Sequence, residues 1–376
     1  MALKVMVISA GYDAQLNEMS HVWQALADRW AVAVQVVAPR HDQLKARRAP
    51  LSRAQHGGLS ITWVEQAFPL RLSPEILALA QAFQPDVLFA GPREHLALAV
   101  ALGREVHAPV LLHTEYFYAD QRWLRRRDYL GISPLRGLMA QRVRRRTLAQ
   151  AHTVCISDPQ EQVHFQAGDA VAYLPWPHLR QAAAHPLPQS ERDLSTLVYI
   201  GSLFRAKGAE RLGVYLAQAL AEIPDLQVRV VGPALDAIGQ AALERIQAAG
   251  GARVQWQESL PRAEAEALIA RAFCILSPGD GMGWGQIGDA WMAETPVIAA
   301  CEHYDLRANV NCLIAATAPD FVAAVQRLRT QPAERARLAQ GGQHSVAAHA
   351  VEAVAATLQG LLARAASATH RERAYG

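Results

Sequence analysis

Lysine is almost missing from this sequence. Only Lys4, Lys45 and Lys207 are lysine, whereas the other 34 of the 37 cationic side chains are arginine. Long hydrophobic runs are missing too, since no stretch approaches the roughly 18 consecutive apolar residues that a membrane-spanning helix needs. The amino terminus has no apolar run of signal-peptide length. The absence of long apolar runs predicts a cytoplasmic protein. The scarcity of lysine means that each lysine within a predicted loop needs an explanation.

Cysteine and net charge are also low. The four cysteines are scattered without a C-x-x-C pair, which favours buried free thiols in a reducing compartment. A net charge of +3 is small for 376 residues and gives no reason to expect a nucleic-acid partner. Because 51% of the residues are hydrophobic and 19% are charged, the chain is predicted to be globular, with a length that suits two domains.

Short apolar runs rich in β-branched residues alternate with longer amphipathic stretches, which is the pattern of a parallel sheet covered by helices. In the first half these runs lie at 3–9, 31–39, 59–64, 86–91, 109–114 and 152–157. The pattern stops in a segment with four prolines, 174–195, and restarts with runs at 196–202, 226–233, 252–258, 272–279, 295–300 and 311–315. We therefore expect two doubly wound α/β domains joined by a linker, with a ligand cleft between the carboxyl ends of their strands.

Lys207 lies in a loop that suits phosphate. In "TLVYIGSLFRAKGAERL" (196–212) a predicted strand is followed by Gly201, a polar loop that ends in Lys207, and a helix. Glycine lets a backbone approach a ligand closely, and a helix N-terminus offers unpaired N–H groups to an anion. A lysine there can reach a phosphate oxygen, with Arg205 as a second cation. The alternative is an ordinary strand–loop–helix turn with two solvated cations.

A glycine-rich loop follows a later predicted strand. Five glycines lie between 279 and 288, and a helical segment, "DAWMAE", comes next. Backbone amides and a helix N-terminus again favour negative charge. Asp280 and Asp289 bracket the loop, and their carboxylates suit the hydroxyl groups of a sugar or ribose. The alternative is a flexible loop in which Asp289 is a helix N-cap or first-turn residue.

Together these segments resemble the GT-B glycosyltransferases, and in particular the large retaining family four that uses nucleotide-sugar donors. That family has a strand–Gly–loop–Lys–Gly segment, then a "PS-x-x-E-G-F-G" loop, then "E-A-M-A-x-G-x-P-V-I-A". Here "GSLFRAKG", "SPGDGMGWG" and "DAWMAETPVIA" occupy those places in the same order. The resemblance covers most of 195–345 well and the N-terminal half loosely. It implies two Rossmann-like doubly wound parallel-sheet domains that face each other across a cleft.

The resemblance also implies a division of the chain. The expected parts are an N-terminal Rossmann-like acceptor domain at 1–175, a linker at 176–195, a C-terminal Rossmann-like donor domain at 196–350, and a C-terminal helix and tail at 351–376 that packs back on the N-terminal domain.

The resemblance assigns roles to particular residues of the donor domain. Lys207 and Arg205, with the amides near Gly283 and Gly285, would hold the donor diphosphate. Trp284 lies between these glycines and belongs to the same set. No D-x-D metal motif is present, so the protein's cations would replace a metal, and no cofactor is expected.

Three positions, Ser202, Gly281 and Asp289, depart from the family's pattern. The family has two glutamates separated by seven residues; Asp289 aligns with the second and would hold ribose hydroxyls. The first falls on Gly281, so Asp280 takes the catalytic role on the donor sugar only with a one-residue insertion. Ser202 stands where the family has its first phosphate-binding cation, so Arg205 must substitute for it.

In the N-terminal half, the family carries a histidine after the strand that corresponds to 109–114. His113 occupies this place, and the resemblance implies a catalytic position near the donor sugar and the acceptor. The alternative is a satisfied histidine at a strand end. A glycine pair near the first strand approaches the donor phosphate in the family; this chain offers Gly11 alone.

The segment 121–152 contains nine arginines and one acid among apolar residues. Such a segment predicts contact with an anionic membrane surface through 121–146, at the inner face of the membrane, or binding of an acidic acceptor such as a lipid-linked phosphate. The alternative is a solvated helix face. No aromatic stacking platform accompanies the arginines, so nucleic acid is not expected.

The expected function is transfer of a sugar from a nucleotide diphosphate sugar to an acceptor sugar, a lipid-linked sugar or a small molecule, with retention, as in synthesis of a cell-envelope polysaccharide. Two alternatives stay open. A GT-B-like nucleotide-sugar epimerase would need acid–base carboxylates, for which Glu94, Glu115 and Asp120 are candidates. A catalytically degenerate homologue would act as a binding or scaffolding subunit.

Overall fold

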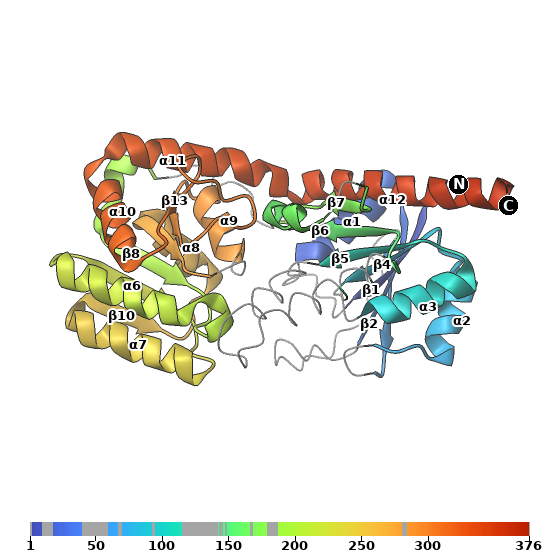
Figure 1. Ribbon diagram of the computed structural model, residues 1–376, viewed down its shortest axis with the longest axis horizontal. Helices are drawn as coiled ribbons and strands as arrows, with labels where there is room; N and C mark the ends of the chain where they lie inside the picture. The colour runs from blue at the N-terminus through green and yellow to red at the C-terminus, as the bar shows by residue number, and fades with distance from the viewer. Residues whose placement is uncertain are drawn as a thin grey trace. The chain divides into compact units, whose positions relative to one another are not determined.

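The computed structural model describes residues 2–9, 18–39, 59–66, 70–91, 95–114, 142, 146, 149–165, 168–178, 187–279 and 284–375. The chain divides into two compact units (Figure 1). One unit comprises Met1–Leu179 together with Val351–Gly376, and the other comprises Arg180–Ala350. The chain therefore passes from the first unit to the second and returns for its last helix.

The first unit is built on a seven-stranded parallel sheet with the order β3-β2-β1-β4-β5-β6-β7. The strands are β1 (Lys4–Ser9), β2 (Ala33–Pro39), β3 (Leu59–Val64), β4 (Val87–Gly91), β5 (Val110–Thr114), β6 (Thr153–Ile156) and β7 (Val171–Tyr173). The order reverses between β1 and β4, which makes this the topological switch point of the sheet.

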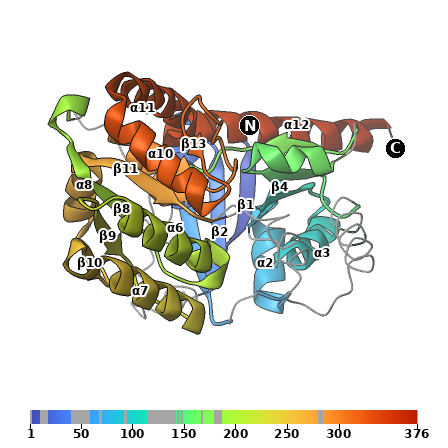
Figure 2. The same ribbon diagram turned by 60° about the vertical axis from the view of Figure 1, so that its left-hand side comes forward.

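Helices cover both faces of this sheet, because its strands are apolar on both sides. Along β1, Val5 and Val7 point into one core, which also contains residues of α1 (Glu18–Trp30) and α12 (Val351–Tyr375). Met6 and Ile8 point into the other core, with α2 (Pro74–Phe83) and α3 (Leu96–Val106). The last helix of the chain thus lies beside the first on one face of the sheet (Figure 1). On the opposite face α2 and α3 pack against each other (Figure 2).

The second unit is built on a six-stranded parallel sheet with the order β10-β9-β8-β11-β12-β13. Its strands are β8 (Asp193–Ile200), β9 (Gln227–Val231), β10 (Val254–Gln257), β11 (Ala272–Ser277), β12 (Val297–Ala299) and β13 (Leu313–Ile314). The order reverses between β8 and β11. The loops that follow these two neighbouring strands therefore meet at one edge of the sheet, where ligands of doubly wound folds bind.

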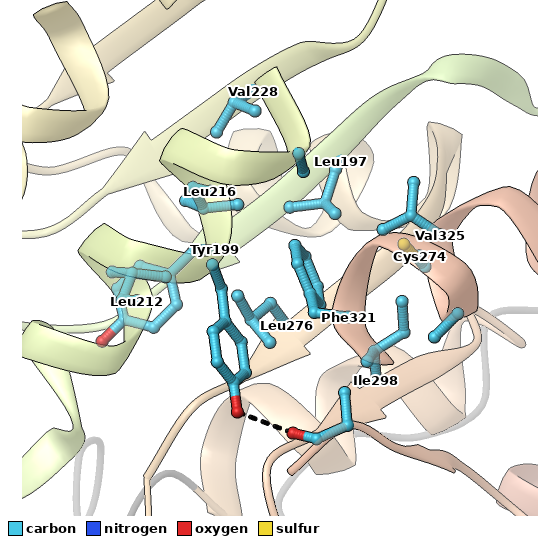
Figure 3. Packing of buried hydrophobic residues seen from close by; sticks show 14 of the residues in the cluster. Leu197, Tyr199, Leu212, Leu216, Val228, Cys274, Leu276, Ile298, Phe321 and Val325 are labelled. Atoms are coloured by element: carbon cyan, nitrogen blue, oxygen red, sulfur yellow. Dashed lines mark hydrogen bonds between the residues drawn. The ribbon is translucent and has the colours of Figure 1, made fainter. Parts of the chain in front are cut away.

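One face of this second sheet packs against α6 (Ala209–Glu222), α7 (Ala237–Gly250) and α10 (Ala318–Thr330). Leu197, Val228 and Phe321 lie in this core (Figure 3). The ring of Phe321 stacks on that of Tyr215 at 5.3 Å between centroids. The other face packs against α8 (Arg262–Arg271) and α9 (Trp284–Met292), and α11 (Pro332–Val346) packs on α9. Among the described residues, no helix has the length and apolar character to cross a membrane.

Candidate functional site

Two loops touch at the switch point of the second sheet. The loop after β8 ends in Gly208, and the loop after β11 begins at Pro278. Gly208 has φ +76°, and a Cβ atom on it would lie 2.4 Å from the carbonyl oxygen of Pro278. Only glycine fits this conformation and this approach. Arg211 of α6 also donates to the Pro278 carbonyl at 2.8 Å, so the two loops are fastened together.

The ammonium group of Lys207 lies at the end of β8. Its Nζ atom is 3.8 Å from the position that a Cβ on Gly201 would occupy, and the side chain is half-buried. The loop below it is held by Tyr199, whose hydroxyl donates to the carbonyl of Ser202 at 3.1 Å. Burial raises the pKa of Tyr199, so the hydroxyl keeps the proton that it donates. Lys207 is thus presented at the carboxyl edge of the sheet on a rigid turn.

Arg205 begins the short 3-10 turn Arg205–Lys207. Its backbone N–H donates to Asp236 at 2.9 Å, and Asp236 also caps α7 by accepting from the N–H of Gly239. Partial desolvation acts to raise the pKa of Asp236, but these backbone hydrogen bonds outweigh it, and the pKa is lowered. The charged carboxylate therefore ties the cationic turn to the neighbouring helix.

The glycine loop is described only in part. Asp280 and Gly283 lie outside the described residues, and α9 begins at Trp284. Gly285 is exposed, and no atom of the described residues would lie within 4 Å of a Cβ atom placed on it. Trp284 as a whole is only 3% exposed, so its indole packs inside the unit.

Asp289, on the second turn of α9, already has a cationic partner. Its Oδ1 atom accepts from the Arg262 guanidinium of α8 at 3.1 Å, and the carboxylate is 19% exposed. Arg262 also pairs with Glu266 one turn further along α8. The ion pair therefore orients the Asp289 carboxylate towards Arg262.

His113 is the penultimate residue of β5 in the first unit and is buried. The hydroxyl of Ser157 donates a hydrogen bond to the carbonyl of Leu174 at 3.0 Å. Its oxygen therefore accepts a hydrogen bond from the Nε2–H group of His113, with 2.8 Å between the two heavy atoms. The imidazole ring also stacks on Trp176 at 5.2 Å. Burial lowers the pKa of His113 to about 4, so the ring is neutral at physiological pH.

Other predicted positions lie outside the described residues. These are Gly11, the candidate epimerase carboxylates and most of the segment 121–152, of which the structure describes 142, 146 and 149–152. Within the described part of the chain, no group of three or more His, Cys, Asp or Glu side chains is arranged to hold a metal ion.

The structure brings a further histidine to the same sheet edge. His303 lies beyond β12, with Nε2 3.5 Å from the hydroxyl of Ser277 at the end of β11, and both side chains are buried. Its ring also contacts Tyr304 edge-on. Neither residue is among the predicted site residues. The signal that marks them is the polar and aromatic run "EHYD" (302–305), which comes directly after a buried strand.

No protein-family model and no curated protein matches the sequence. Solved structures do match over nearly the whole chain. Sucrose-phosphate synthase from Thermosynechococcus elongatus has a TM-score of 0.71 at 17% identity, over 97% of this chain and 100% of that one. HepE from Anabaena, in complex with UDP-glucose, has a TM-score of 0.69 at 14% identity, over 96% and 100%. The lipopolysaccharide outer core galactosyltransferase WaaB has a TM-score of 0.66 at 12% identity, over 95% and 98%.

These matches define the class of fold. The chain has the GT-B fold of glycosyltransferases, with two parallel-sheet α/β units, and the fold that the sequence predicts is confirmed. At these identities the likeness establishes the fold alone, so the activity has to be argued from the residues of the site.

Proposed function

We propose that this protein is a glycosyltransferase that transfers a sugar from a nucleotide diphosphate sugar to an acceptor, with retention at the anomeric carbon. One observation carries the proposal. The turn that bears Lys207 and the loop that leads to α9 are in backbone contact, through Gly208 and Pro278, at the switch point of the second sheet. We infer that this contact brings Lys207, Arg205 and the N-terminus of α9 to one binding site, because cations and a helix N-terminus are the chemistry that recognises a diphosphate.

In the proposed mechanism the diphosphate lies against Lys207 and Arg205 and accepts hydrogen bonds from the N–H groups near Gly283 and Gly285, at the start of α9. Negative charge grows on the leaving diphosphate as the glycosidic bond breaks. Donors that are fixed beforehand stabilise this charge most strongly at the transition state. Because the cations belong to the protein, the proposed reaction needs no metal and no cofactor.

The other predicted residues take positioning and binding roles. Asp289, oriented by Arg262, would accept the ribose hydroxyls, and Asp280 would contact the donor sugar. Ser202 and Trp284 would contribute through their backbones, as would Gly11 in the first unit. His113 would contact the sugar or the acceptor as a neutral imidazole. Its low pKa makes it a poor proton donor at neutral pH, so its proposed role is contact and not acid catalysis.

Similar proteins guide the choice of substrates. HepE was solved with UDP-glucose, and separately with UDP and glucose, so UDP-glucose is the first donor to test. WaaB is a lipopolysaccharide galactosyltransferase, which supports a sugar or lipid-linked sugar of the cell envelope as the acceptor. We place the protein in the cytoplasm, with 121–146 as the segment that would contact an anionic membrane surface.

The proposal is tested by thermal unfolding with UDP, GDP and ADP, together with hydrolysis of UDP-glucose. UDP at roughly 100 times its Kd should stabilise the protein by about 2.7 kcal/mol. Lys207→Met should weaken binding by about 10- to 100-fold, the range for loss of a charged hydrogen bond. Arg245→Met, which removes the same charge from an exposed position on α7, is the matched control. Equal binding by the two variants would refute the diphosphate site.

A second candidate is a binding subunit that holds a nucleotide sugar without transferring it. The ion pair between Asp289 and Arg262 favours it, because a carboxylate with a built-in cationic partner is less available to a substrate. The two candidates differ in one result. The binding subunit would be stabilised by UDP, yet it would neither hydrolyse UDP-glucose nor transfer glucose to any acceptor of a sugar panel.

A further inference from the structure

The start of α9 is anchored by an aromatic stack. The indole of Trp284, the first residue of the helix, lies face to face with the imidazole of His349, at 3.9 Å between ring centroids and an angle of 28°. Tyr304 packs on the same indole at 5.6 Å, although its own backbone is in the left-handed region at φ +51°. A non-glycine residue held in that conformation shows that the surrounding contacts determine the position closely.

His349 is itself held in one orientation. Its side chain is completely buried, and its Nε2 atom is 2.8 Å from Oδ2 of Asp305. A carboxylate only accepts, so Nε2 donates the proton. The loop that carries Asp305 is fixed in turn by Asn311, whose amide donates to the Asp305 carbonyl and to Ser345 of α11, each at 2.8 Å. The stack therefore rests on a rigid support.

His349 also lies close to the point where the chain leaves the second unit. His349 ends the 3-10 turn Ala347–His349, and the second unit ends at Ala350. The next residue, Val351, begins α12, which belongs to the first unit. One side chain thus touches the first residue of the helix after the glycine loop and stands two residues before the chain leaves the unit.

We propose that His349 is a positioning residue of the donor site. Through Trp284 it fixes the first turn of α9, and it ties that turn to the point where the chain enters α12. The inference rests on the proposed function, because this turn is the one assigned to the donor diphosphate. Binding of a nucleotide at the start of α9 then affects residues 349–351, where the chain passes from the second unit into α12. In the same way, a change at these residues alters the affinity for the nucleotide.

The first measurement needs no nucleotide. Amide hydrogen exchange at 288–292, where the N–H groups close the first turns of α9, is compared between the parent protein, His349→Ala and His349→Phe. His344→Ala, an exposed histidine on α11, is the control. Exchange should rise about two- to tenfold in His349→Ala, the range for loss of one aromatic stack, and return towards the parent value in His349→Phe, which keeps a stacking ring.

The second measurement is the affinity for UDP, followed by the fluorescence change of Trp284, taken as the difference between the parent and Trp284→Phe. His349→Ala should raise the Kd for UDP by about two- to tenfold, and His349→Phe should restore it. Trp256→Phe, an exposed tryptophan of the same unit, should leave the UDP-dependent change intact.

The outcomes separate the two proposals. If exchange at 288–292 is the same in His349→Ala and His344→Ala, the positioning role is overturned. If exchange responds as expected and UDP binds the parent protein, but His349→Ala and His344→Ala bind UDP with equal affinity, the coupling to the donor site is overturned. If neither UDP, GDP nor ADP binds the parent protein, the proposed function fails, and with it the role of His349 in donor binding.

Discussion

Gly342 of α11 provides the space that the indole of Trp291 occupies. A Cβ atom on Gly342 would lie 2.2 Å from Cδ1 of Trp291, far closer than two carbon atoms can approach. Trp291 is fully buried, and its Nε1 atom donates to the carbonyl of Asn311 at 3.3 Å. The glycine in the middle of a helix is therefore explained by packing: it lets α11 lie close against α9.

Gly342→Ala should lower the free energy of unfolding by about 1–3 kcal/mol, because the added methyl group displaces a buried ring. Gly360→Ala is the control, since Gly360 is also inside a helix, α12, and its nearest neighbour is the end of the Arg364 side chain at 3.6 Å. There the change should be neutral or stabilising by up to about 1 kcal/mol. Chemical unfolding measures both, and equal effects would contradict the packing explanation.

Gly208→Ala should abolish the stabilisation by UDP. The new Cβ would lie 2.4 Å from the Pro278 carbonyl oxygen, so the two loops of the candidate site would have to separate. Gly251 also has a positive φ, +53°, but a Cβ on it would meet no atom of the described part of the chain within 4 Å. Gly251→Ala should therefore cost only the strain of a backbone conformation that favours glycine (φ +53°, ψ −125°), about 1–3 kcal/mol, and keep the thermal shift with UDP. A full shift in Gly208→Ala would show that the contact is not needed.

Acid should destabilise the first unit through His113. Burial lowers its pKa from 6.5 to about 4, so between these two values the unfolded chain binds more protons than the folded one. The free energy of unfolding should contain the whole contribution of His113 above about pH 6.5. It should fall by about 3 kcal/mol as the pH is lowered to about 4. His113→Asn should flatten this part of the profile of unfolding free energy against pH, whereas His344→Asn should follow the parent. Parallel profiles for all three proteins would rule out His113 as the cause.

Arg192 should be essential for stability although it is remote from the candidate site. Its buried guanidinium donates to the carbonyls of Ala270 and Ala293 and to the hydroxyl of Thr295, at 2.9, 2.6 and 2.6 Å. Burial lowers its pKa to about 10, so it is charged at neutral pH. Arg192→Met leaves these acceptors without a donor and should cost about 3 kcal/mol or more. Arg271→Met, at an exposed position on α8, should cost under about 0.5 kcal/mol.

The fold could be predicted because the periodic pattern of apolar residues indicates where the strands and helices lie. Each strand of the second sheet coincides with an apolar run, from β8 near Tyr199 to β13 at Leu313–Ile314. The strands β1 to β6 of the first sheet also overlap predicted apolar runs, but β7 (Val171–Tyr173) lies in none of them. It has three residues, lies at a sheet edge and is half-buried, so it leaves little hydrophobic signal.

The site was harder to predict because its contacts join distant parts of the chain. The position of Lys207 beside Gly201 follows from local sequence, since both lie in one strand–loop–helix segment. The partners of Trp284 and Asp289 do not. The first stacks on a histidine 65 positions away, and the second pairs with an arginine from the preceding helix. Residue types near a glycine loop indicate a ligand, but which side chains face inward depends on tertiary packing.

The return of the chain for α12 has a consequence for synthesis of the protein. Val354, Leu358 and Leu362 complete the apolar layer over α1, yet they leave the ribosome only after the whole of the second unit. At ~5–20 residues per second, the nascent first unit waits roughly 10–35 s with α1 uncovered. A chaperone that binds exposed apolar helices should therefore associate with ribosomes that carry this chain, and should be released when the final helix emerges.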